Sequence, residues 1–154
     1  MPQVNTLAEA QEWLDREVGV SDWLTISQDD VNQFADTTRD HQFIHLDAER
    51  ASRETPFGGT IAHGFLTLSL LSHLGASAGT VRMADTKIMI NYGLDKVRFL
   101  NPVRVGKQVR GRFELMSVEE KKPGQFLIKH RATVEIEGEE RPAMIAEWLG
   151  LSIT

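Results

Sequence analysis

The chain has 154 residues, of which 41% are hydrophobic and 25% are charged, and its formal net charge is -5. These values predict one globular domain over residues 1–154, and the negative charge argues against a general binder of nucleic acid or anionic membranes. The absence of cysteine excludes disulfides, thiolate nucleophiles and cysteine metal sites.

The sequence carries no visible targeting signal. No apolar run approaches the roughly 20 residues that span a membrane. The first residues lack the basic and apolar regions of a secretory signal. We therefore expect a cytoplasmic protein that contacts neither membrane nor nucleic acid.

The N-terminal part predicts two helices and a short strand. Thr6, with a glutamate three residues later, has a capping-box pattern, so we expect a helix from residue 8 to about 18. Residues 22–26 read as a strand. Ser27 is expected to cap a second helix over residues 29–38, whose early aspartates suit a helix N-terminus.

An uncharged stretch, residues 61–80, occupies the middle of the chain. It follows a loop over residues 56–60 that is rich in glycine and proline, and it opens on His63 and Gly64. Large apolar groups occur in every direction around a helix drawn through residues 63–74. This pattern predicts a helix that is buried on all sides.

The second half alternates apolar and polar residues in the manner of strands. We expect strands over 86–92, 95–100, 109–115, 126–136 and 143–153. The turns between them are short, which favours an antiparallel meander whose first two strands pair. A buried helix and a sheet with one polar face fit together in one way. The predicted fold class is α+β, with an antiparallel sheet wrapped around a long central helix.

The most informative segment runs from Asp40 to His45. Asp40 can orient a water molecule, and His45 can accept a proton from that water near neutral pH. Gly64 would present a free backbone N–H at the start of the buried helix, where an oxyanion is stabilised. Spacing alone leaves other interpretations open: Asp40 could simply end the preceding helix region, and His63 could be a buried histidine satisfied by a backbone carbonyl.

Two blocks, residues 34–47 and 58–66, together resemble the MaoC-like (R)-specific enoyl-CoA hydratases, which have the hot-dog fold. Within that family the chain is most similar to the nodulation protein N-like group, and residues 91–99 share the similarity. The family's usual Asp-x-Asn-Pro-x-His reads here with Gln42 and Phe43 in place of Asn and Pro. This chain therefore retains the aspartate and the histidine of the family motif and differs from it at two positions between them.

The resemblance implies specific roles. Asp40 and His45 would be the catalytic pair that adds water across a trans-2-enoyl-CoA. The Gly64 amide would bind the thioester oxygen, with His63 beside it at the substrate, and Ser72 would support the active-site loop from the central helix. Hot-dog domains commonly pair edge to edge, so the resemblance also implies a homodimer.

A basic stretch provides candidate contacts to coenzyme A. Six basic residues and no acidic one lie between Lys96 and Arg112. Arginine and lysine bind phosphate, which makes Arg98, Arg104 and Lys107 candidates. The alternative, which we favour for most of them, is the solvated face of alternating strands.

No metal or cofactor is expected beyond the coenzyme A thioester as substrate. His41 and His45 are four residues apart, but the sequence offers no evident third ligand beside them.

Two rival functions remain open. One is a hot-dog acyl-CoA thioesterase, although no Asp or Glu lies between residues 61 and 80, where such enzymes often carry one. The other is a non-catalytic domain that binds an acyl group or a protein partner.

Overall fold

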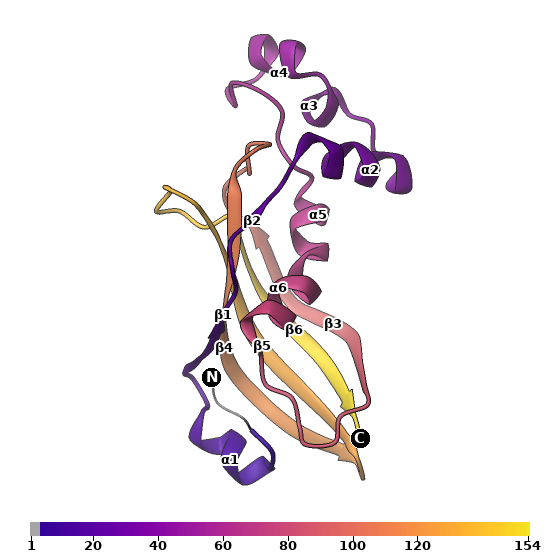
Figure 1. Cartoon of the computed structure of the whole chain (residues 1–154), viewed down its shortest axis with the longest axis vertical. Helices are drawn as coiled ribbons and strands as arrows, with labels where there is room; N and C mark the ends of the chain where they lie inside the picture. Colours follow the sequence, from indigo (N-terminus) through magenta and orange to yellow (C-terminus); the bar gives the residue numbers. More distant parts are fainter. Residues whose placement is uncertain (1–3) are drawn as a thin grey trace.

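The computed structural model describes residues 4–154 as a curved antiparallel sheet with helices beside it and beyond its two ends (Figure 1). The strands are β1 (Glu17–Val20), β2 (Leu24–Thr25), β3 (Ile88–Phe99), β4 (Gln108–Lys122), β5 (Gln125–Ile136) and β6 (Met144–Ile153). The helices are α1 (Leu7–Glu12), α2 (Gln28–Thr38), α3 (Phe43–Leu46), α4 (Ala48–Glu54), α5 (Gly64–Ser69) and α6 (Leu71–Ala78). No helix in this part of the chain is long and apolar enough to cross a membrane.

The sheet confirms the α+β fold class and part of the predicted meander. The strand order is β1-β4-β5-β6-β3, with β2 added beside β4. Strands β4, β5 and β6 form an antiparallel meander, as predicted. Strand β3 does not pair with β4, the next strand in the chain, but closes the far edge of the sheet against β6.

The predicted pair of strands over residues 86–92 and 95–100 is wrong, because these residues form the single strand β3. The expected turn is absent because the strand absorbs its irregularities as bulges. The pairing with β6 shifts register between Asn91 and Gly93 and again between Leu94 and Lys96. A bulge inserts a residue and bends a strand without reversing it.

The first predicted helix is also too long. The Thr6–Glu9 capping box is present, but α1 ends at Glu12, and Asp15 follows with a φ of 57°. This left-handed residue is incompatible with a continuing helix. The chain then pairs with β4 as β1, which buries Val18. The second helix is confirmed, with Ser27 and Asp30 forming a capping box at α2.

The central helix is divided at Leu70 into α5 and α6, and it is not buried on all sides in this chain. The core side carries Leu66, Leu71 and Leu74, which pack against the sheet. On another side Phe65 is 68% exposed. The sheet covers only one face of the helix, so apolar residues on the remaining surface stay uncovered.

Close approach between α6 and the sheet depends on Gly19 in β1. A Cβ added at Gly19 would lie 2.5 Å from the Ala78 carbonyl oxygen, closer than atoms tolerate. The core beneath the helix is filled by fully buried side chains of the sheet, including Phe113, Ile128 and Met144. This packing fixes the helix against the sheet and so positions the residues at its start.

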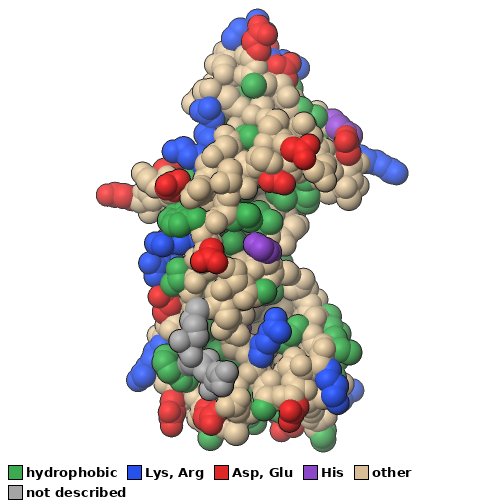
Figure 2. Space-filling view, viewed as in Figure 1, with side chains coloured by type: hydrophobic (Ala, Val, Ile, Leu, Met, Phe, Trp, Pro, Cys, Tyr) green, Lys and Arg blue, Asp and Glu red, His purple; other side chains and the backbone are tan. Residues whose placement is uncertain are grey.

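Strand β3 leaves a row of large apolar side chains exposed at the sheet edge. These are Ile88, Met89, Ile90, Tyr92, Leu94 and Phe99. Figure 2 shows hydrophobic side chains at mid-height, at the level of α5, and along the side where β3 lies in Figure 1. Contiguous apolar surface of this kind marks an interaction site in a folded protein.

Candidate active site

Three short segments bring the predicted catalytic residues together. Helix α2 ends at Thr38, and its C-cap residue Arg39, whose backbone is left-handed (φ 65°), turns the chain sharply into Asp40. The one-turn helix α3 then carries His45. His63 precedes α5, so the third segment is the start of the central helix. The site is therefore built where these helix ends meet, above the sheet.

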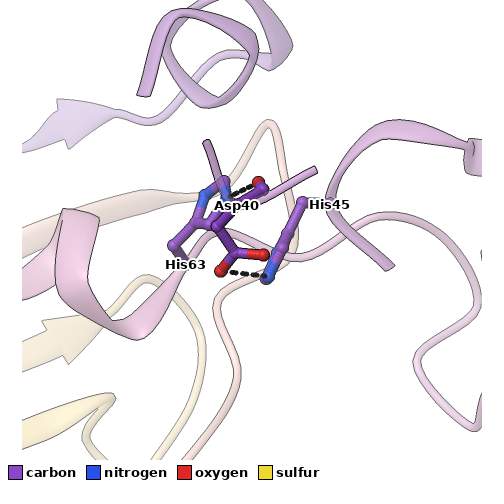
Figure 3. A group of neighbouring side chains, drawn as sticks. All are labelled: Asp40, His45 and His63. Atoms are coloured by element: carbon purple, nitrogen blue, oxygen red, sulfur yellow. Dashed lines mark hydrogen bonds and ion pairs between the residues drawn. The ribbon is translucent and has the colours of Figure 1, made fainter. Parts of the chain in front are cut away.

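Asp40 and His45 point toward each other (Figure 3). The Asp40 Oδ2 and His45 Nε2 atoms are 4.0 Å apart, too far for a direct hydrogen bond. The Asp40 side chain is 52% exposed, whereas that of His45 is 8% exposed. One member of the pair faces solvent and the other is sheltered.

A backbone hydrogen bond sets the tautomer of His45. Its Nδ1 donates to the Ile61 carbonyl oxygen at 2.7 Å. A carbonyl only accepts, so the proton resides on Nδ1 and the lone pair of Nε2 faces Asp40. Burial lowers the pKa of His45, and nearby His63 lowers it further, while the Ile61 hydrogen bond and Asp40 act in the opposite direction. The net lowering favours the neutral form, which can accept a proton.

His63 contacts both members of the pair. Its Nε2 donates to the Asp40 backbone carbonyl at 3.0 Å, and its ring stacks on His45 with centroids 3.7 Å apart. The Phe34 ring also packs against His63, with ring centroids 5.0 Å apart. The alternative interpretation from the sequence, a buried histidine satisfied by a backbone carbonyl, describes what the structure shows at Nε2. The His63 Nδ1 atom is buried and has no hydrogen-bond partner in the part of the chain that the structure describes.

Gln28 was not among the residues predicted from the sequence, and it holds the α3 segment in place. Its Nε2 donates to the His45 carbonyl oxygen at 2.8 Å, and its Oε1 accepts from the Thr60 hydroxyl at 2.7 Å. One side chain at the start of α2 thus links the two loops that carry the site. Nothing in the pattern around Gln28 signals these contacts, because both partners are distant in sequence.

The two departures from the family motif have clear positions. Gln42 is the residue before α3, and its backbone N–H lies 3.4 Å from the Asp40 carboxylate. Phe43 has the Arg50 guanidinium 3.9 Å from its ring centroid. This cation–π contact ties α3 to α4, a connection that the family's proline would not make.

A hollow of about 380 Å³ adjoins His45 and Gly64. Phe99, at the end of β3, lies against Gly64: a Cβ added there would come within 3.1 Å of the Phe99 ring. Within residues 4–154 no hydrogen bond from the Gly64 N–H is found. The amide and the imidazole therefore border the same space.

The structure does not bring Ser72 to the catalytic loop within this chain. Its hydroxyl accepts a hydrogen bond from Asn91 Nδ2 of β3 at 3.0 Å. Arg104 donates to the Phe57 carbonyl oxygen at 2.7 Å and lies against the loop that precedes the central helix. Arg98 and Lys107 are exposed. Their contact with coenzyme A stays a prediction.

His63 is a possible third metal ligand beside Asp40 and His45, and the sequence did not predict this proximity. Ligand atoms of Asp40, His45 and His63 lie within 4.8 Å of one another. The two rings, however, are inclined by only 22°. A metal bound by imidazole lies near the ring plane, and two nearly parallel stacked planes share no such position. The stacking therefore disfavours joint ligation by the two histidines.

Comparison with known proteins decides the family. The MaoC like domain matches residues 9–139. The chain belongs to the MaoC-like family. It is 48% identical over 144 residues to Nodulation protein N of Rhizobium leguminosarum bv. viciae, covering 94% of this chain and 89% of that protein. It is equally identical over 147 residues to 3-hydroxyacyl-thioester dehydratase Z of Mycobacterium tuberculosis (strain ATCC 25618 / H37Rv), covering 96% and 95% of the two chains.

The fold is likewise that of solved MaoC-like proteins. The (R)-hydratase from A. caviae involved in PHA biosynthesis superposes with a TM-score of 0.70 at 28% identity, covering 87% of this chain and 95% of that chain. The monoamine oxidase regulatory protein from Archaeoglobus fulgius superposes with a TM-score of 0.73 at 23% identity, covering 92% and 91%. The MaoC-like resemblance and the hot-dog fold predicted from the sequence are confirmed.

Proposed function

We propose that this MaoC-like protein is an (R)-specific enoyl-CoA hydratase, a hydro-lyase that adds water to trans-2-enoyl-CoA and removes it from the 3-hydroxyacyl-CoA. The named dehydratase and (R)-hydratase relatives support this activity. The observation that carries it is the Asp40–His45 pair, with a neutral imidazole lone pair aimed at a carboxylate.

The 4.0 Å separation suits a single bridging water. Two hydrogen bonds of about 2.8 Å that meet at one oxygen at roughly 90° span this distance. Asp40 would accept one water hydrogen and orient the molecule, and His45 Nε2 would accept the other. Burial keeps His45 neutral for this task, whereas exposure leaves Asp40 open to incoming water.

The reaction follows from these positions. The water oxygen bonds to C3 of the enoyl group as its proton passes to His45 Nε2. The electron pair of the C2–C3 double bond moves toward the thioester oxygen, where the Gly64 amide would stabilise the charge. A proton then returns to C2, which completes the addition. Removal of water runs through the same steps in reverse.

The exposed β3 edge supports a homodimer. The apolar side chains of β3 need a covering surface, and a second copy of the same strand would extend the sheet across a two-fold axis. The hollow beside Gly64 includes Phe99 of this strand, so the dimer would border the substrate path. A cytoplasmic location and the lack of a cofactor stay predictions.

The decisive assay follows crotonyl-CoA by two signals. Hydration removes the ultraviolet absorbance of the enoyl thioester without releasing free thiol, whereas a thioesterase releases thiol. Loss of absorbance with formation of (R)-3-hydroxybutyryl-CoA would establish the hydratase. Thiol release alone would establish the rival thioesterase. The absence of both signals would favour a non-catalytic binding domain.

A further inference from the structure

The seam between the central helix and β3 extends well beyond the catalytic pair. Gly64 lies against Phe99 at one end, and Ser72 bonds Asn91 further along, so the helix and the strand run in opposite directions. Two more hollows follow this seam, and both are bordered by Ser72, Asn91 and Trp148. The far hollow has a volume of about 160 Å³.

The wall of the far hollow is organised by polar contacts. The Asn91 side chain accepts from the Trp148 indole N–H at 3.0 Å and donates to Ser72 at 3.0 Å. The indole is held against Gly75, where an added Cβ would lie 2.9 Å from the ring. These hydrogen bonds tie the helix, β3 and β6 to one another. The residues at this end are therefore fixed in place.

A buried histidine also borders the far hollow. His130 of β5 is 4% exposed, and its Nε2 has no hydrogen-bond partner among residues 4–154. Burial lowers the pKa of His130 to about 4, so the ring is neutral at physiological pH. A neutral imidazole can either donate or accept a hydrogen bond. Buried polar atoms normally have a partner, so an unpaired one beside a hollow indicates a ligand position.

Of the described residues that line this hollow, Arg82 is the one with a charged side chain. It is exposed, and among residues 4–154 it forms no ion pair. A guanidinium binds a carboxylate with two parallel hydrogen bonds. The far end of the seam thus combines a free cation with neutral hydrogen-bonding groups, which is unsuited to a purely hydrocarbon chain.

We infer that this end of the seam binds a carboxylate at the far end of the acyl chain, so that preferred substrates are ω-carboxylated enoyl-CoA thioesters. This inference rests on the proposed hydratase function. Ser72 lies eight positions after Gly64 along the central helix, a rise of about 12 Å at 1.5 Å per residue. An extended chain of roughly nine or ten carbons spans that length, given C–C bonds of about 1.5 Å. The length of the seam then sets the preferred length of the acyl chain, and Arg82 binds the carboxylate at its end.

The test compares two substrates of equal length, trans-2-decenoyl-CoA and its ω-carboxylated counterpart, with crotonyl-CoA as reference. The native protein should show kcat/KM on the order of tenfold or more in favour of the carboxylated substrate. Arg82→Met should reduce that preference to near unity and leave crotonyl-CoA hydration unchanged. Arg16→Met, an exposed arginine that precedes β1 at the opposite sheet edge, should preserve the preference.

A second variant covers the neutral part of the site. Asn91→Leu removes the amide between Trp148 and Ser72 and should raise the use of decenoyl-CoA relative to its carboxylated counterpart. Equal use of the two long substrates by the native protein would overturn the inference, as would an unchanged preference in Arg82→Met. Failure to hydrate crotonyl-CoA would instead overturn the proposed function.

Discussion

The ring of His63 stacks on that of His45, with centroids 3.7 Å apart, and the His63 Nε2 donates a hydrogen bond to the Asp40 backbone carbonyl. One side chain therefore fixes the distance between an acid and a base that do not touch directly. Neither contact places His63 on the substrate. These contacts predict that His63 is a positioning residue for the pair. The substrate-binding role that the family resemblance implies for His63 stays a prediction.

Replacing His63 by Phe separates the contribution of its ring stacking from that of its hydrogen bond. The ring stacking is kept, but the hydrogen bond to Asp40 is lost. We expect kcat to fall on the order of tenfold, because small errors in the placement of reacting groups are costly, with a smaller change in KM. The acid limb of the rate profile should move to higher pH, because His63 lowers the pKa of His45. His73→Phe, at an exposed histidine of α6, is the control; a variant with native kcat and profile would refute the positioning role.

Asp40→Asn and His45→Gln should each lower crotonyl-CoA hydration by on the order of 10²-fold or more, because each removes a group that handles the water. Far-ultraviolet circular dichroism and thermal melting should stay close to those of the native protein. Matched controls lie nearby: Asp36→Asn and His41→Gln alter an exposed pair outside the site. Full activity in a folded Asp40→Asn variant would eliminate the proposed activation of water.

The pH dependence of hydration should report on His45. Its neutral form accepts the proton, so the rate falls as pH drops through its pKa. Burial lowers that pKa below the ordinary value of 6.5, so activity should persist below pH 6.5 before it declines. Initial rates measured from pH 4 to pH 8 would define the acid limb of the pH–rate profile. A limb centred above 6.5 would contradict the buried, neutral base.

Gln28→Leu should weaken the support of the site. The change leaves the His45 carbonyl and the Thr60 hydroxyl without their partner. We expect the free energy of unfolding to fall by about 1–3 kcal/mol, together with a lower kcat. Gln33→Leu, in the same helix, removes only an exposed contact to Asp29 and serves as the control. Urea denaturation of both variants measures the difference.

Ile90→Glu should disrupt the proposed dimer. Ile90 is 45% exposed on β3, and a carboxylate there would face the apolar strand of the second copy. Light scattering during size-exclusion chromatography should show the native protein as a dimer and the variant as a monomer. Trp23→Glu places the same charge at a residue 39% exposed near β2 and should remain dimeric. A native protein that is monomeric at all concentrations would refute the dimer.

The proximity of Asp40 and His45 was the most predictable feature of the candidate site. Asp40 and His45 lie within one short segment, so their proximity depends on local chain geometry. The supporting contacts were not predictable, because Gln28, Ile61 and His63 reach this segment only after tertiary folding. For His63, a single long-range hydrogen bond provides the backbone-carbonyl partner that one of the open interpretations expected.

The fold was predicted where local periodicity agrees with tertiary pairing. Strand β5 follows its alternating pattern, and α2 follows its cap. The errors occurred where distant pairing overrides local preference: residues 17–20 leave a helical pattern to join β4, and Gly93 lies in a bulge within a long strand. The exposed side of the central helix was missed because the sequence pattern alone does not reveal which face the sheet covers.

The position of β3 has a consequence for handling the isolated protein. This 12-residue strand ends the sheet, so a lone copy presents unpaired backbone groups beside apolar side chains. Other chains can add to such an exposed strand edge. Dilution or substitutions that disrupt the proposed dimer would therefore favour aggregation over dissociation into soluble monomers. The two bulges distort the register of this edge and so restrict which strands can dock there.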